Sequence, residues 1–230
     1  NVGYGGYSSY DFDAKSIHAA EAHTCAVTTE GGIKCWGQQE FGRLGHQGAT
    51  QADSGLNIDD VVFPTHRNAI SMDTRYQHNC AITDDGGVWC WGRNTNGQLG
   101  YGDQTDRSYP FEVTLPEERF ATKVSTGNEF SCAILDNASI ACWGLNILGQ
   151  LGDGTNTNYT TPTFVALESG TQVETMSSGA SHSCAIISNG SILCWGRNNV
   201  GQLGINSTSD TNMPTFVQLP IGRSAVMIDA

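Results

Sequence analysis

Eight cysteines are the residues of this chain whose type and spacing most clearly permit chemistry. They fall into four pairs, and nine residues separate the two members of every pair. An even number of cysteines at one repeated spacing favours disulfide bonds, which persist in oxidising compartments such as the extracellular space. The predicted pairs are Cys25 with Cys35, Cys80 with Cys90, Cys132 with Cys142, and Cys184 with Cys194.

Zinc binding is the alternative chemistry for these cysteines, because a histidine stands two residues before the first cysteine of three pairs. These histidines are His23, His78 and His182, and the third pair has Phe130 at the same place. Structural zinc sites usually bring two ligands much closer together in the sequence, as in a C-x-x-C motif. A ligand that one copy of four lacks is a poor ligand, and we therefore predict no metal site.

The same histidines are weak candidates for catalysis. We find no Asp or Ser beside them at a repeated partner position, which a general base would use. We expect each histidine to end a strand and to bond to a loop carbonyl. The glycine-rich turns also lack the lysine of a phosphate-binding loop. The sequence therefore predicts no catalytic residue, no cofactor and no enzymatic activity.

Composition argues against several classes of partner. The formal net charge is -12, with 11 Lys and Arg residues against 23 Asp and Glu residues, whereas nucleic-acid binding needs clustered Lys and Arg. No run of about 18 apolar residues predicts a membrane span. The loop carboxylates Asp103, Asp106 and Asp153 do not form the alternating acidic pattern of a calcium loop. We expect no nucleic-acid partner, no direct membrane insertion and no calcium site.

The elements that would position the cysteines recur along the chain. The first cysteines of the pairs are 55, 52 and 52 residues apart, and a period near 50 is typical of propellers. Each repeat holds a short apolar segment, two cysteine-bearing strands and a last strand, led by proline in three copies, which matches a four-stranded blade. We predict an all-β protein, a β-propeller with four visible blades of about 52 residues each. The predicted units are an N-terminal Gly-, Tyr- and Ser-rich segment at 1–13, repeats at about 14–68, 69–120, 121–172 and 173–224, and the start of a fifth repeat at 225–230.

The spacing within each cysteine pair also predicts its geometry. A three-residue loop at 29–31 places Cys25 opposite Cys35, and the other pairs follow the same register. Directly opposed residues in a non-hydrogen-bonded antiparallel pair lie about 4.5 Å apart at Cα, which suits a disulfide. Glycine holds the third loop position in three copies, because glycine adopts a positive φ without steric cost. The third copy has Ala138 there, where we expect strain or a different turn.

Each copy continues from its second cysteine into Trp-Gly and a Gly-rich turn. The second copy reads His-Asn-Cys-Ala-Ile from His78 and ends in Gly97-Gln-Leu-Gly100, and the fourth ends in Gly201-Gln-Leu-Gly204. We expect the Trp to pack between blades, the Gln to bond loop backbone and the Leu to anchor the turn. In the first copy Gln and Arg replace Asn and Gln, at positions 39 and 43.

Over about residues 14–224 this pattern resembles the repeat of the regulator of chromosome condensation family. The resemblance implies a β-propeller, usually seven-bladed, that binds other proteins through its loops. The paired cysteines are similar to a secreted-type variant of the repeat, which implies an extracellular setting. The exchange-factor role of the nuclear member is not implied, because the loops on which it depends have no match in this sequence.

The last residues of the chain repeat the start of its first unit. Residues 224–230 align with residues 13–19, so a fifth repeat is expected to begin there. We expect the four visible repeats to belong to a longer chain and a larger ring of up to seven blades. A complete small ring, or an oligomer that shares strands, is the alternative.

Four N-x-Ser/Thr sequons are candidates for glycosylation, at Asn137, Asn158, Asn189 and Asn206. Asn137 and Asn189 fall at predicted hairpin tips, and the other two fall in the polar loops that follow Gly-Gln-Leu-Gly. All four are expected in surface loops, as glycosylation requires. Chance is the alternative explanation, because turns favour Asn in any case.

Three functions remain open at this stage. The first is an extracellular, disulfide-stapled propeller that binds a protein partner through the loops that differ between copies. The second is a structural assembly module of a cell-surface protein or filament, which includes assembly with copies of itself. The third is a carbohydrate-binding propeller in which the tyrosines Tyr101, Tyr109 and Tyr159 stack on sugars.

Overall fold

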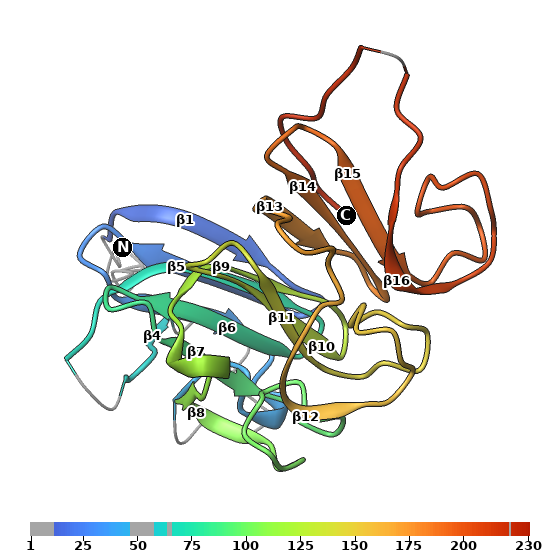
Figure 1. The fold of residues 1–230 in the computed structure, drawn as a ribbon. Helices are drawn as coiled ribbons and strands as arrows, with labels where there is room; N and C mark the ends of the chain where they lie inside the picture. Colours follow the sequence, from blue (N-terminus) through green and yellow to red (C-terminus); the bar gives the residue numbers. More distant parts are fainter. Residues whose placement is uncertain (1–11, 47–57, 64–65, 221) are drawn as a thin grey trace, which may run out of the picture.

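The computed structural model describes residues 12–46, 58–63, 66–220 and 222–230. These residues form four antiparallel sheets of four strands each, which confirms the predicted all-β propeller architecture. Each sheet is a meander in chain order, and we call the sheets blades 1 to 4. Figure 1 shows the blades following one another from the blue first sheet to the red fourth sheet. Most of the predicted N-terminal segment, residues 1–11, lies outside the described residues.

The strands fall into four classes by their place in the blade. The first strands are β1 (Ala14–Ala19), β5 (Ala69–Arg75), β9 (Ala121–Thr126) and β13 (Val173–Ser178). The second strands are β2 (His23–Thr28), β6 (His78–Thr83), β10 (Phe130–Leu135) and β14 (His182–Ile187). The third strands are β3 (Ile33–Gly37), β7 (Val88–Gly92), β11 (Ile140–Gly144) and β15 (Ile192–Gly196). The last strands are β4 (Asp59–Asp60), β8 (Arg107–Val113), β12 (Tyr159–Phe164) and β16 (Thr211–Phe216).

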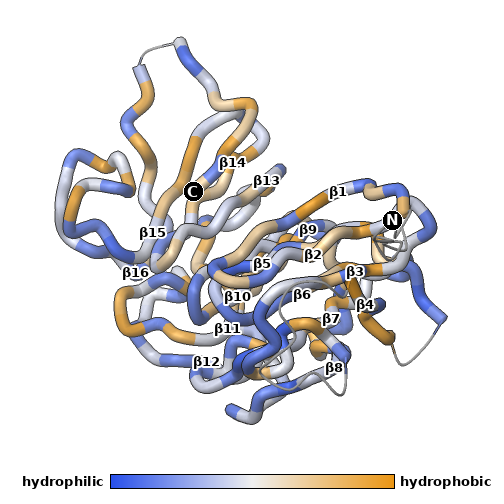
Figure 2. Tube along the Cα trace, turned by 180° about the vertical axis from the view of Figure 1, so that it is seen from behind, coloured by the Kyte–Doolittle hydropathy of each residue, from blue (hydrophilic) through white to orange (hydrophobic). Residues whose placement is uncertain are grey.

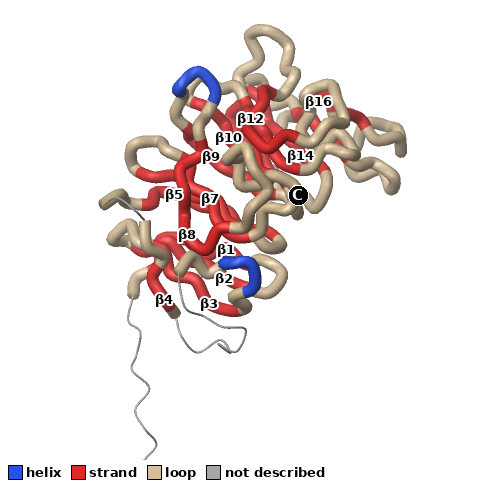
Figure 3. Tube along the Cα trace, turned by 90° about the horizontal axis from the view of Figure 1, so that it is seen from below, coloured by secondary structure: helices blue, strands red, loops and turns tan. Residues whose placement is uncertain are grey.

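Helical structure among the described residues is confined to two short 3-10 turns, η1 (Glu40–Gly42) and η2 (Pro116–Glu118). Figure 3 shows that strands and loops make up nearly all of the remaining chain. No helix in the described part of the chain is long and apolar enough to span a membrane.

The hairpin between the second and third strands has the register expected from the cysteine spacing. Cys25 pairs with Cys35, and the backbone N–H of Thr28 donates to Gly32 O at 2.8 Å, which leaves a three-residue loop. All four bridges are present, each with a Cα–Cα distance of 4.1 Å. Ala138 adopts the same left-handed conformation as the glycines, with φ of 62°. The loop therefore keeps its turn and places an alanine in a strained conformation.

The core lies between neighbouring blades. The disulfide face of each of blades 1 to 3 packs against the tryptophan face of the next blade, as when Trp91 of blade 2 joins Val27 and Ile33 of blade 1. Neighbouring blades also meet along their first strands, β1 with β5, β5 with β9, and β9 with β13. Alternation along the strands therefore buries apolar side chains on both faces of the two middle blades. Figure 2 shows that the loop between β15 and β16 is, by contrast, largely hydrophilic.

The C-terminal residues 225–230 lie where the first strand of a further blade would lie. Ala225 N donates to Gly190 O at 2.8 Å and Ala230 N donates to Ser177 Oγ at 3.0 Å. Between blades 3 and 4 the first strand of blade 4 makes the same two bonds: Val173 N donates to Ala138 O, and Ser178 N donates to Ser125 Oγ. These residues therefore dock on blade 4 in the manner of a first strand, in line with their alignment to the first repeat.

Candidate interaction face

The meander places two kinds of loop at opposite edges of every blade. One edge, which we call the turn face, carries residues 38–45, 93–100, 145–152 and 197–204. The other edge, the hairpin face, carries the loops at residues 29–31, 84–86, 136–138 and 188–190. Because the strands are antiparallel, each loop type stays on its own side of the propeller.

Buried side chains hold every glycine turn in one shape. In blade 2 the Leu99 N–H donates to Asn94 Oδ1 at 2.9 Å, and the Asn96 N–H donates to Gln98 Oε1 at 2.9 Å. Blades 3 and 4 repeat both bonds. In blade 1 Gln39 replaces the asparagine and its Oε1 accepts from Leu44 N at 3.0 Å. The predicted roles of Gln and Leu are thus present, and the Asn contributes a second bond.

The turns of blades 1 to 3 are also tied to the following blade. The indole N–H of Trp143 donates to Gln98 O at 2.9 Å, and Trp195 and Trp91 bond to positions 150 and 43 in the same way. Gly100 is required at this contact, because a Cβ there would lie 2.9 Å from Trp143 Nε1. The expected packing of Trp between blades is confirmed. The sequence did not indicate its acceptor, because that group is a backbone carbonyl.

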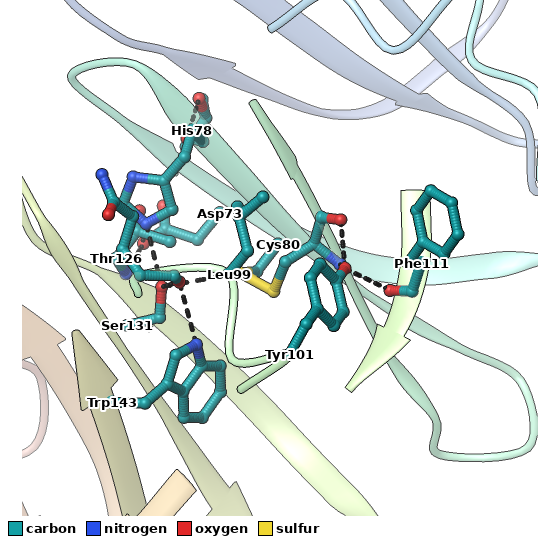
Figure 4. Close-up of a disulfide and its surroundings, with 12 residues drawn as sticks. Asp73, His78, Cys80, Leu99, Tyr101, Phe111, Thr126, Ser131 and Trp143 are labelled. Atoms are coloured by element: carbon teal, nitrogen blue, oxygen red, sulfur yellow. Dashed lines mark hydrogen bonds between the residues drawn. A yellow bond between two sulfur atoms is a disulfide. The ribbon is translucent and has the colours of Figure 1, made fainter. Parts of the chain in front are cut away.

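The repeated histidines form a second connection between blades. His78 Nε2 lies 2.9 Å from Ser131 Oγ (Figure 4), and Ser131 Oγ in turn donates to Gln98 O at 2.9 Å. His78 is therefore the donor in the first of these bonds. His23 makes the corresponding bond to Asn79 Oδ1 at 2.8 Å.

For His23 and His78 this result corrects the expectation of a bond to a loop carbonyl. Their partners are side chains of the next blade, at the position just before each first cysteine. That position holds Asn or Ser in copies two to four, which was a visible signal that the sequence reasoning missed. Burial lowers the pKa of His23 to about 4 and that of His78 to about 3. Both rings are neutral at pH 7 and serve as structural donors.

The exposed tips of the turns differ from blade to blade although their scaffold is constant. Ile147 at the tip of blade 3 is 60% exposed, and Val200 at the tip of blade 4 is 78% exposed. Blade 2 has Thr95 and Asn96 at the corresponding positions. The turn face therefore presents an apolar tip on each of two adjacent blades, on backbone that buried hydrogen bonds hold rigid.

Blade 1 contributes a different surface to the same face. Phe41 is half-buried, has φ of 61°, and lies with its ring 5.0 Å from the Arg93 guanidinium and 5.7 Å from that of Arg43. Arg93 also donates to Gln77 Oε1 at 2.7 Å. Such cation–π contacts hold an aromatic ring and two positive charges together beside blade 2.

The acidic loop residues hold the loops after the glycine turns in place by accepting hydrogen bonds. Asn94 N donates to Asp106 Oδ1 at 2.7 Å, and its side-chain Nδ2 donates to Asp103 Oδ1 at 3.1 Å. In blade 3, Asn146 Nδ2 donates to Asp153 Oδ1 at 3.0 Å. Within the described residues, no group of three or more His, Cys, Asp or Glu side chains could hold a metal ion.

The three tyrosines are not the exposed platform that sugar stacking would need. The Tyr101 hydroxyl donates to Phe111 O at 2.6 Å and also contacts Cys90 O, and burial raises the pKa of this hydroxyl. Tyr109 is half-buried, and Tyr159 packs against the core between blades 3 and 4. All three side chains are half-buried, so the expectation of exposed aromatic rings at these positions was wrong.

The four sequons are divided between the two faces. Asn137 and Asn189 stand in exposed hairpin loops, and Asn158 and Asn206 stand in exposed loops that follow the glycine turns. The four cysteine pairs, in contrast, lie within blades, and no free cysteine occurs in the described part of the chain.

The repeated turn, the Trp contact and the four-stranded blade agree with comparisons to known proteins. The model of the regulator of chromosome condensation (RCC1) repeat matches residues 85–134, 140–186 and 189–230. The chain belongs to the RCC1 repeat family. A second model of this repeat matches residues 121–150 and 173–202, so RCC1 motifs cover most of blades 2 to 4.

Among curated relatives, the ultraviolet-B receptor UVR8 of Arabidopsis thaliana is 29% identical over 205 residues, which are 89% of this chain and 46% of UVR8. The RCC1-repeat chain thus spans about half the length of this relative. A structure of yeast RCC1 (Prp20) bound to Kap60 superposes with a TM-score of 0.79 at 20% identity, over 94% of this chain and 51% of that one. The ectodomain of the receptor kinase CR4 from Physcomitrella patens gives 0.52 at 20% identity, over 82% and 42%. At these identities the two structures establish the shared fold.

Proposed function

We propose that this RCC1-repeat propeller is an extracellular protein-binding module and that its turn face contacts the partner. The observation that carries the proposal is the contrast within each turn. Asn, Gln and Leu side chains hold the backbone, while the tip residues are exposed and differ between blades. A constant scaffold with variable tips is how loop-based binding surfaces are usually built.

The apolar tips are the part of the turn face that we expect a partner to bury. Ile147 and Val200 stand on neighbouring blades, and each presents an exposed apolar side chain. Burying one such side chain against a partner contributes about 1.5–3 kcal/mol. The solved structure of yeast RCC1 bound to Kap60 supports the idea that a propeller of this fold takes a protein partner.

Two observations support the extracellular setting. Each blade contains a disulfide, and such bonds are rare in reducing compartments. The CR4 ectodomain is a receptor-kinase example of the same fold. Thiol labelling of the protein purified without reductant tests this part, and reactive cysteines in the native protein would count against it.

The turn-face proposal is tested with a variant in which the apolar tip residues of blades 3 and 4 are replaced by the residues at the same positions in blade 2. Ile147→Thr with Val200→Asn copies the blade 2 tip and should leave the buried scaffold unchanged. Phe120→Ser, at a 58% exposed residue next to the hairpin loop at Gly86, is the matched control. Cross-linking under oxidising conditions with mass spectrometry would identify the bound protein. We expect the tip variant to lose it and the control to retain it, and equal binding by both would refute the assignment of the face.

A second candidate, assembly through blade 4, has its own observation. The far side of blade 4 exposes the half-buried residues Ile205, Val217 and Ile228 over a small cluster around Cys184 and Cys194. In the other blades the same region is covered by the tryptophan of the next blade. We propose that a further RCC1 repeat covers this side, either later in a longer chain or in a neighbouring molecule. Light scattering separates these cases, since only the second makes particles larger than one chain.

A further inference from the structure

We propose that Asn137 and Asn189, at the hairpin tips of blades 3 and 4, carry N-linked glycans. The inference rests on the extracellular setting proposed above. It selects two of the four sequons and places the glycans on the hairpin face, away from the turn face.

In blades 2 to 4 one side-chain oxygen closes the hairpin loop. In blade 2 this loop reads Asp85-Gly-Gly, and Asp85 Oδ1 accepts from Gly87 N at 3.3 Å. In blade 3 Asn137 Oδ1 accepts from Ser139 N at 3.1 Å, and in blade 4 Asn189 Oδ1 makes the same bond at 2.9 Å. The turn is thus closed equally well by a carboxylate followed by two glycines.

The change from Asp-Gly-Gly to Asn-x-Ser is therefore not explained by the fold. Blades 1 and 2 have an acidic residue at the first of these positions and glycine at the third. Blades 3 and 4 have both Asn and Ser, although the turn of blade 2 closes with Asp85 and has glycine in place of the Ser. The two residues that the glycosylation machinery reads occur together in both blades.

Both asparagines are also accessible for modification. Asn137 and Asn189 are exposed, and among the described residues neither side-chain Nδ2 has a hydrogen-bond partner. In blade 3 the Ser139 hydroxyl donates to Asn137 Oδ1 at 2.6 Å. The carbonyl oxygen is therefore held toward the turn, and the amide nitrogen remains available to react.

The other two sequons have structural explanations. Asn158 Oδ1 accepts from the buried turn at Asn146 N at 2.8 Å, and Asp106 and Asp210 do the same in blades 2 and 4. Asn206 has φ of 55° at the place where blade 3 has a glycine, Gly154. Asparagine is common in that left-handed conformation. These positions need no glycan to explain their residue type.

The chemistry is a glycosyl transfer from a polyprenyl-diphosphate oligosaccharide, supplied by the secretory pathway. The Asn Nδ2 forms a bond to the sugar C1, and the bond between C1 and the phosphate oxygen breaks. The nitrogen loses one proton, and the polyprenyl diphosphate leaves with the bonding electrons. A bulky, hydrated group then stands on each of the two hairpin tips.

The test is site mapping on the full chain, expressed behind a secretion signal in a eukaryotic host. Amidase release of N-glycans converts each modified Asn to Asp, which peptide mass spectrometry localises. We expect conversion at Asn137 and Asn189. Asn137→Asp and Asn189→Asp copy Asp85, so each should remove one glycan and leave the thermal midpoint unchanged. Asp85→Asn is the control and should add no glycan, because Gly87 stands two residues later, where a sequon needs Ser or Thr.

The outcomes separate this inference from the proposed function. Glycans are mapped on both cell-associated and secreted chains. Cleavage of the secretion signal is confirmed first, because it shows that the chain entered the secretory pathway. Chains that entered the pathway and remain unmodified at either tip would overturn the inference for that site, even if all cysteines are oxidised. Glycosylated chains that bind no partner through the turn face would refute the proposed function and leave the inference standing. Modification at Asn158 and Asn206 in place of the hairpin tips would overturn it as well.

Discussion

The substitution His78→Phe should make the protein less sensitive to acid. His78 is fully buried, and burial lowers its pKa to about 3, compared with about 6.5 in an unfolded chain. Between these values the unfolded chain binds a proton that the folded protein does not. The free energy of unfolding therefore falls as the pH decreases below about 6.5, by up to about 1.4 kcal/mol per pH unit.

Between pH 7 and pH 5 this single histidine should lower the free energy of unfolding by about 2 kcal/mol. The chain itself shows that phenylalanine fits, because Phe130 occupies the matching position in blade 3 and is 1% exposed. In His78→Phe, Ser131 keeps its bond to Gln98 O. The loss of one hydrogen bond should therefore cost only about 1 kcal/mol at pH 7.

Urea unfolding at pH 7 and pH 5, with disulfides intact, measures the effect. We expect His78→Phe to be slightly less stable than the wild type at pH 7 and more stable at pH 5. The reciprocal variant Phe130→His should show the opposite change, an additional loss of about 2 kcal/mol between these pH values. Equal losses for the wild type and His78→Phe over this range would refute the reasoning that the neutral form of this buried histidine is favoured by folding.

Three further predictions follow from the repeated contacts. Ala138→Gly should raise the thermal unfolding midpoint, because relief of the left-handed alanine contributes about 1 kcal/mol; a lower midpoint would show that no strain is present. Trp143→Phe should lower the free energy of urea unfolding by about 2–4 kcal/mol through a cavity and the loss of the hydrogen bond from the indole to Gln98 O. Trp36→Phe should cost less, because Trp36 is only half-buried, and equal costs would contradict the role assigned to the contact between blades. Removing one bridge, with Cys132→Ala and Cys142→Ala together, should lower the unfolding free energy by about 2–3 kcal/mol in the same assay, and an unchanged value would count against the loop-closure estimate.

Much of the blade was predictable because its determinants are local. The nine-residue gap between Cys25 and Cys35, with a glycine at the third loop position, sets one hairpin register. Alternation along short strands then assigns the buried faces. Repetition of this unit four times made a propeller the expected architecture, without any long-range information.

The contacts between blades were harder to predict because they join residues more than 30 positions apart through groups with no sequence signature. The acceptor for Trp143 is the backbone carbonyl of Gln98, which any residue would provide. The His78 bond to Ser131 was visible only as a weak coincidence of polar residues before each cysteine. The choice of partner depends on how one blade is placed on the next.

The repeat period, the disulfide-bonded hairpins and the polar turns could be predicted from the amino-acid sequence, since each depends on residues close together in the chain. The tertiary structure decided which side chains remain available for recognition. Tyrosine is a residue type common in binding sites, yet the Tyr101 hydroxyl donates a hydrogen bond to Phe111 O within its own blade. Isoleucine is typical of protein cores, yet Ile147 is exposed to solvent. Burial depends on the neighbouring blade and its loops, and this is why exposure at a position could be assigned only after the blades had been placed together.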